Sequence, residues 1–177
     1  MPTQPHPIGF NQACLPIVLG VTGHRDVEDL EDIEAILKRE ITRLKQQYPH
    51  TPFAAMSALA EGADRLFGQV ALDLGIPLYV PLPLPLTEYE KDFPDSINTF
   101  RALCHRAQAV FSVPYVSGAD AENSALPGFY RNLQYAQAGI YIALRSHILF
   151  ALWDGKPPRG FGGTAQIVRF RQTGHIH

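Results

Sequence analysis

The sequence passes from an apolar strand to a new helix in the stretch Ile148-Leu149-Phe150-Ala151-Leu152-Trp153, with Asp154-Gly155 closing the strand and Gly162-Gly163-Thr164 preceding the helix. Glycine lets backbone N–H groups come close to an anion, Thr164 adds a hydroxyl donor, and the first N–H groups of a helix have no intrahelical partner. A phosphate group is the natural occupant of such a turn. An ordinary flexible connection is the alternative interpretation.

The rest of the chain repeats this alternation of short apolar runs and amphipathic segments. Strands are expected at 15–21, 52–60, 76–82, 109–113 and 148–153. Helices are expected at 26–44, 63–74, 95–107 and 129–144 and from 165 onward, and irregular segments at 83–94 and 114–128. This alternation predicts an α/β fold, a three-layer Rossmann-like domain with a mostly parallel five-stranded sheet and helices on both faces.

Length and composition suit one globular domain. The chain has 177 residues, 46% of them hydrophobic and 18% charged. Residues 1–14 are expected to form a flexible leader and 15–177 a single nucleotide-binding domain. Fifteen Lys and Arg against 17 Asp and Glu give a formal net charge of −2, so no nucleic-acid partner is expected.

Cysteine usage and apolar stretches indicate the compartment. Cys14 and Cys104 are far apart and follow no metal-ligand spacing, which favours a reducing, cytoplasmic location. The proline-rich N-terminus carries no signal-peptide pattern. The longest apolar stretch is too short to span a bilayer, so no membrane association is expected. We expect no metal and no required cofactor.

Polar residues gather where the expected strands end, which is the edge at which open parallel sheets bind ligands. The predicted ligand-binding residues are Gly23, His24, Arg25, Ser57, Glu61, Gly62, Asp64, Asp154, Gly162, Gly163 and Thr164. Glycines, Arg25, Ser57 and Thr164 would contact phosphate, whereas Glu61 and Asp64 would contact sugar or serve as a general base.

These residues also have structural interpretations. Arg25 could pair with a neighbouring acid, His24 could make a local turn hydrogen bond, and Glu61 and Asp64 could complement a helix dipole. The polar ends of Tyr89 and Asp92 could line the cleft or only dock an irregular segment. No P-loop, dinucleotide-binding glycine fingerprint or serine-hydrolase elbow is present in the sequence.

The order of these motifs resembles the SLOG superfamily, the Rossmann-like group that includes the DNA-processing protein A family and the LOG (lonely guy) phosphoribohydrolases. Over residues 15–172, Gly20 to Arg25 looks like the first-strand turn of that group, and the chain is most similar to its bacterial members that begin with Val-Thr-Gly-His-Arg. Ser57 to Asp64 looks like the Ser-Gly-(Leu/Met)-Ala-x-Gly-(Ile/Val)-Asp stretch of the DNA-processing branch. Gly162 to Thr164 is similar to the Gly-Gly-x-Gly-Thr signature of the LOG branch.

The resemblance implies that a nucleotide or nucleotide-derived ligand is bound or sensed at this edge. LOG enzymes carry a glutamate after this signature, whereas this chain has Gln166 and no carboxylate in 165–168. The alternative function is a LOG-like N-glycosidic hydrolase of nucleoside monophosphates, with Glu61 or Asp64 supplying the carboxylate. A homodimer through the tyrosine-bearing helix 129–144 is a further prediction.

Overall fold

The computed structural model describes residues 15–27, 29–157 and 162–175. The expected leader at 1–14 lies outside these residues. Within them, five strands form one sheet in the order β4-β3-β2-β1-β5, and every neighbouring pair is parallel. The strands are β1 (Ile17–Gly23), β2 (Phe53–Met56), β3 (Leu78–Leu82), β4 (Ala109–Ser112) and β5 (Ile148–Leu152).

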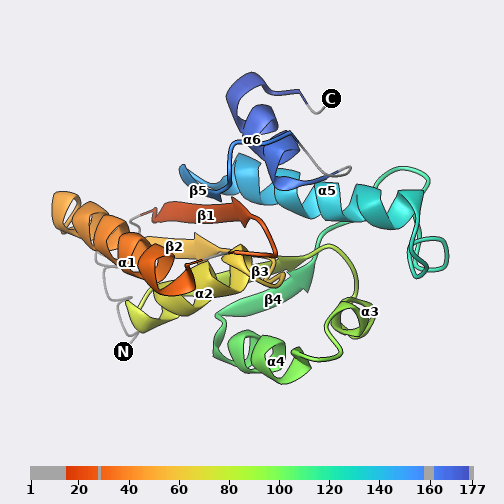
Figure 1. Ribbon diagram of the computed structural model, residues 1–177, viewed down its shortest axis with the longest axis horizontal. Helices are drawn as coiled ribbons and strands as arrows, with labels where there is room; N and C mark the ends of the chain where they lie inside the picture. Colours follow the sequence, from red (N-terminus) through yellow and green to blue (C-terminus); the bar gives the residue numbers. More distant parts are fainter. Residues whose placement is uncertain (1–14, 28, 158–161, 176–177) are drawn as a thin grey trace, which may run out of the picture.

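Helices cover both faces of the sheet. They are α1 (Leu30–Gln47), α2 (Ala63–Asp73), α3 (Leu86–Tyr89), α4 (Ile97–Arg106), α5 (Phe129–Arg145) and α6 (Thr164–Thr173), with a 3₁₀ turn at Glu90–Asp92. Figure 1 shows α1, α2 and α4 on one side of the sheet and α5 and α6 on the other. The predicted three-layer Rossmann-like α/β fold is confirmed.

Burial follows the amphipathic patterns of the sequence. Leu19 and Val21 in β1 are buried, as expected for a central strand that is covered on both faces. Phe67 and Val70 of α2 are fully buried. Ile142 of α5 is only 3% exposed. The hydrophobic core therefore lies on both faces of β1. Its packing fixes the positions of the loops that follow this strand.

The direction of the strand connections changes at β1. The chain leaves β1 for α1 and β2 on one side, whereas β5 pairs on the other side, with Gly23 opposite Leu152. The loops after β1 and β5 therefore lead to helices on opposite faces, α1 and α6 (Figure 1). This arrangement is the topological switch point at which open α/β sheets bind ligands.

Two local expectations need correction. Helix α1 begins at Leu30 behind Asp29, which has a left-handed backbone, rather than behind Asp26. The segment 83–94 was expected to be irregular but contains α3 and the 3₁₀ turn, because Tyr89 and Phe93 pack edge-on with ring centroids 4.9 Å apart and are fully buried. Among the described residues, no helix is both long and apolar enough to cross a membrane.

Candidate functional site

A cavity of about 610 Å³ lies at the carboxyl ends of the strands. It is lined by residues from five separate segments: Thr22 to Asp26 after β1; Ala58, Ala60 and Asp64 after β2; Tyr89 and Asp92 after β3; Arg131, Tyr135 and Gly139 on α5; and Gly162 to Ala165 at the start of α6. The structure thus brings together Gly23, His24, Arg25, Asp64 and the Gly-Gly-Thr turn around one hollow.

The turn before α6 is held in shape by contacts of its own. Gly162 has φ +79°, and a side chain there would meet the α5 backbone at Ala136, 3.0 Å from its nitrogen. The N–H of Gly162 donates to the side-chain oxygen of Gln166 at 2.6 Å. Gln166 therefore fixes this turn.

The start of α6 leaves donors facing the cavity. Gly163 is the N-cap residue, and its carbonyl accepts the N–H groups of Gln166 and Ile167 at 2.9 and 3.2 Å. The preceding N–H groups of Thr164 and Ala165 lie in the first turn, where no intrahelical acceptor exists. Thr164 and Ala165 both line the cavity, so this helix end presents amide donors and a hydroxyl to any occupant.

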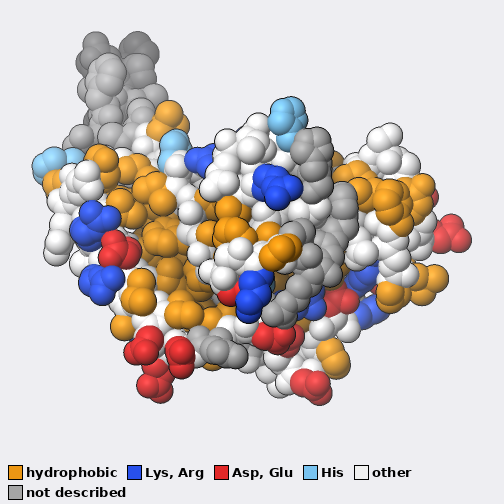
Figure 2. Space-filling model, turned by 45° about the horizontal axis from the view of Figure 1, so that its top comes forward, with side chains coloured by type: hydrophobic (Ala, Val, Ile, Leu, Met, Phe, Trp, Pro, Cys, Tyr) orange, Lys and Arg blue, Asp and Glu red, His pale blue; other side chains and the backbone are white. Residues whose placement is uncertain are grey.

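Arg25 is a cationic residue that lines the same cavity as the start of α6. Its side chain lines the cavity, and its guanidinium lies 5.9 Å from the centre of the Tyr135 ring. Within the described part of the chain, it makes no hydrogen bond or ion pair. Some surface arginines are paired, as Arg101 is with Glu90 at 2.8 Å, whereas the exposed Arg145 and Arg169 also make no ion pair within the described residues. Figure 2 shows Lys and Arg spread over one face, several beside Asp or Glu.

Asp64 is a carboxylate in the wall of the same cavity. Its residue is only 9% exposed, and the backbone N–H groups of Ala58 and Ala60 donate to its carboxylate. Burial raises the pKa of Asp64 to about 7, against the opposing effect of those amides and of the Arg25 charge. This group therefore exchanges a proton near neutral pH.

The loop between β2 and α2 is closed by its own residues. The Ser57 hydroxyl donates to the Asp64 carbonyl at 2.9 Å and accepts the Leu59 N–H at 3.1 Å. Gly62 has φ +76°, and a Cβ there would lie 2.0 Å from the Arg25 carbonyl oxygen. Neither Ser57 nor Gly62 lines the cavity, so their predicted phosphate contacts remain predictions.

Glu61 and Asp154 also lie outside the cavity lining. Glu61 accepts a hydrogen bond from the Ser96 hydroxyl and lies 3.9 Å from Arg65. Asp154 accepts from the His24 ring at 3.1 Å, which ties the loop after β1 to the loop after β5. Hydrogen bonds from the Lys156 backbone and side chain and from His24 hold the pKa of Asp154 well below its usual range.

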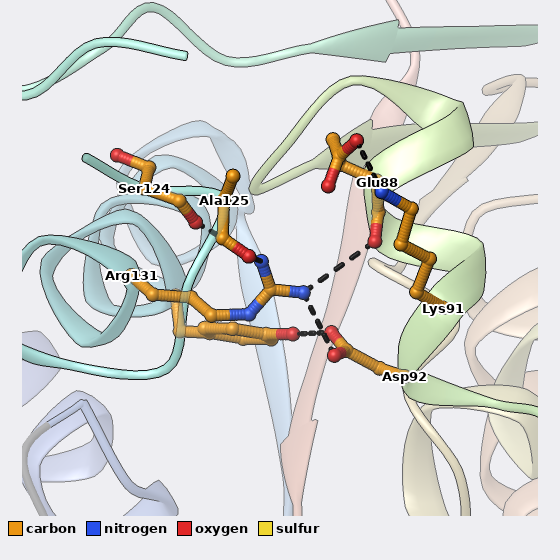
Figure 3. A network of polar contacts seen from close by, with 7 residues as sticks. Glu88, Lys91, Asp92, Ser124, Ala125 and Arg131 are labelled. Carbon is orange, nitrogen blue, oxygen red and sulfur yellow. Dashed lines mark hydrogen bonds and ion pairs between the residues drawn. The ribbon is translucent and has the colours of Figure 1, made fainter. Parts of the chain in front are cut away.

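The sequence did not predict the buried network of ion pairs and hydrogen bonds around Arg131, which lines the cavity from α5. Arg131 is 7% exposed and donates to the Asp92 carboxylate at 2.7 Å and to the carbonyls of Ser124 and Ala125 at 3.0 and 3.2 Å. Figure 3 shows this guanidinium reaching from α5 toward Asp92. The Tyr135 hydroxyl also donates to Asp92. Because Arg131 and Tyr135 are four residues apart on α5, their helical spacing was the available signal.

The described residues contain no group of three or more His, Cys, Asp and Glu side chains placed to hold a metal ion. The polar residues that line the cavity include His24, Arg25, Asp26, Asp64, Tyr89, Asp92, Arg131, Asn132, Tyr135 and Thr164.

Comparison with known proteins supports the fold assignment. No protein-family model matches the chain. No curated protein sequence matches it. Its fold is similar to that of the X-ray structure of DNA processing protein A from Streptococcus pneumoniae, with a TM-score of 0.57 and 15% sequence identity. The match covers 89% of this chain and 48% of the other, so this chain spans about half the length of that protein.

The domain is therefore of the Rossmann-like α/β class. At 15% sequence identity, the match to DNA processing protein A bears on the fold alone. The same match contradicts the expectation that no nucleic acid is a partner, because a protein with this fold is named for DNA processing. That expectation rested on the net charge of −2, which describes the whole chain and not one surface, and it is withdrawn.

Proposed function

We propose that the cavity binds a nucleotide or a nucleotide-derived ligand, with a phosphate group between Arg25 and the start of α6. The observation that carries this proposal is that an arginine without an ion-pair partner in the described residues and a helix N-terminus line one cavity. Both groups attract anions, the first by its full charge and the second by oriented amide dipoles.

Size and charge distribution favour a nucleotide over a bare phosphate ion. The volume of about 610 Å³ lies within the range of roughly 300–1,000 Å³ that is usual for small-molecule sites. The ionised Asp64 carboxylate also lines the cavity and would repel a second phosphate there, whereas the Asp92 carboxylate is paired with Arg131. The anionic end of the ligand is thus directed to Arg25 and α6, and its uncharged part to the carboxylates.

Calorimetric titration with AMP, ADP-ribose, NAD and cyclic nucleotides tests this proposal. We expect at least one of them to bind, and we expect Arg25→Ala and Thr164→Ala to weaken that binding. Arg169→Ala is the matched control, because Arg169 is exposed on α6 and does not line the cavity. Absence of binding by all these ligands, or equal binding by the wild type and both variants, would contradict the proposal.

A second candidate function is cleavage of the N-glycosidic bond of a nucleoside monophosphate. The observation that favours it is Asp64, whose raised pKa of about 7 suits a general acid or base at a cavity wall. The structure favours Asp64 over Glu61 for this role, because Glu61 lies outside the lining and is engaged by Ser96. Release of free base from AMP that is lost in Asp64→Asn and kept in Glu61→Gln would establish this activity.

A further inference from the structure

Tyr89 is a fully buried tyrosine whose hydroxyl has no hydrogen-bond partner among the described residues. Its ring is held edge-on by Phe93 and Phe100, with centroid separations of 4.9 and 5.6 Å. A buried phenol normally finds a partner, because an unsatisfied polar group costs free energy. This hydroxyl therefore needs an explanation.

The position of Tyr89 supplies one. Tyr89 lines the cavity, and its hydroxyl lies within electrostatic range of Asp64, Arg25 and Asp92, which line the cavity as well. Burial first, and the Asp64 charge second, raise the pKa of Tyr89, so the phenol keeps its proton and remains a hydrogen-bond donor. The unpartnered hydroxyl and the Asp64 carboxyl group thus belong to residues that line the same cavity.

Asp64 retains acceptor capacity in that cavity. Its carboxylate accepts the N–H groups of Ala58 and Ala60, and a carboxylate has about four lone-pair positions. A ligand group that donates to Asp64 and accepts from Tyr89 would satisfy both side chains. Phosphate oxygens only accept and are repelled by a carboxylate, whereas a hydroxyl group both donates and accepts.

We infer that Tyr89 and Asp64 form a subsite for a hydroxyl group of the ligand, so that the ligand is a phosphorylated sugar with a free ring hydroxyl, as in a ribonucleotide. This inference rests on the proposed function, since it takes the phosphate to lie at Arg25 and α6. It adds Tyr89 as the residue that selects for the sugar.

The test compares AMP, 2′-deoxy-AMP and 3′-deoxy-AMP by calorimetry. We expect the wild type to bind AMP roughly ten-fold more tightly than one of the two deoxy compounds, as for one hydrogen bond to a buried or charged group. In Tyr89→Phe, the affinity for AMP should fall to that of this deoxy compound, whose own affinity should not change. Tyr141→Phe is the matched control, because Tyr141 lies on α5 outside the cavity lining.

The outcomes separate this inference from the proposed function. Equal binding of AMP and both deoxy compounds by the wild type, which needs no variant, would overturn the hydroxyl subsite while leaving the phosphate site in place. An unchanged preference for AMP in folded Tyr89→Phe would overturn the part assigned to Tyr89. Failure of all three compounds to bind would overturn this inference, and the proposed function falls with it only if ADP-ribose, NAD and cyclic nucleotides also fail to bind.

Discussion

The loop after β2 and the turn before α6 both lead through a glycine into a helix, but their backbone N–H groups have different surroundings. Each has a glycine as the N-cap residue of a helix, Gly62 before α2 and Gly163 before α6, and each was expected to hold a phosphate. In the loop after β2, Ser57 and Asp64 accept the backbone N–H groups of the loop itself. In the turn before α6, Gln166 accepts the N–H of Gly162, and Thr164 and Ala165 line the cavity.

This difference shows what a glycine-rich helix start does and does not specify. Such a motif provides amide donors, but a nearby side chain can accept them and close the site. Asp64 stands one residue inside α2 and closes its own loop, whereas no carboxylate stands in the first turn of α6. The two helix starts can therefore be distinguished by experiments on stability and on binding.

The largest expected effect is on folding and follows from Gly62→Ala. The left-handed backbone and the Arg25 carbonyl, which would lie 2.0 Å from the new Cβ, should together cost at least about 3 kcal/mol of unfolding free energy. Gly75→Ala is the control, because Gly75 has φ +71° with no heavy atom within 4 Å of its Cβ position, and about 1 kcal/mol is expected there. Urea denaturation measures both, and equal losses would contradict the tight closure of this loop.

The next effect is the pH dependence that Asp64 gives to stability. Its native pKa of about 7 exceeds the ordinary value of 3.8, so the native state keeps a proton that the unfolded state releases. Its contribution to stability is therefore lost as the pH rises from about 4 to about 7, by a few kcal/mol in all at roughly 1.4 kcal/mol per unit. The unfolding free energy of the wild type should therefore fall relative to that of Asp64→Asn as the pH rises through this window, because the amide does not titrate. A difference that does not vary with pH would show that the native pKa is not raised.

A paired substitution then compares the two helix starts directly. Ser57→Ala leaves the Leu59 N–H buried without its acceptor and should cost about 1–3 kcal/mol of stability without a direct effect on nucleotide contacts. Thr164→Ala should leave stability nearly unchanged and weaken nucleotide binding roughly five-fold. Thermal denaturation measures the stability of each variant, and calorimetry measures its nucleotide affinity. A larger loss of affinity in Ser57→Ala than in Thr164→Ala would reverse the comparison.

The smallest effect concerns Tyr89→Phe in the absence of ligand. Removal of an unpartnered buried hydroxyl should leave stability unchanged or raise it by about 1 kcal/mol. Tyr135→Phe, which loses a bond to Asp92, should instead be destabilising by a similar amount. Melting temperatures of the two variants check this contrast. A clear loss of stability in Tyr89→Phe would mean that its hydroxyl has a partner in the free protein.

The fold could be predicted because burial and periodicity are written into the sequence. All five strands and the larger helices overlap the ranges that apolar spacing predicted, although β2 ends at Met56 and not at residue 60. The site was harder to predict than the fold, because hydrogen bonding within a loop depends on three-dimensional contacts. The sequence could not show that Ser57 accepts the Leu59 N–H, or that Arg131 reaches Asp92 across 39 positions of the chain.

The predicted homodimer shows the same limitation. Tyr135 is one of the tyrosines of the helix that was expected to pair two copies, but it lines the cavity and donates to Asp92. Phe129 and Leu144 of the same helix are 68% and 65% exposed, and pairing of two copies through them remains a prediction.

We propose that the start of α6 is open to phosphate whereas the start of α2 is closed. Amide chemical-shift mapping compares the two helix starts in one titration. Uniformly ¹⁵N-labelled protein would be titrated with AMP, and the amide resonances of both helix starts would be followed. We predict that the largest shifts occur at Gly163, Thr164 and Ala165, with Gly62 and Ala63 shifting less. Larger shifts at Gly62 and Ala63, or no shifts at the start of α6, would contradict the account.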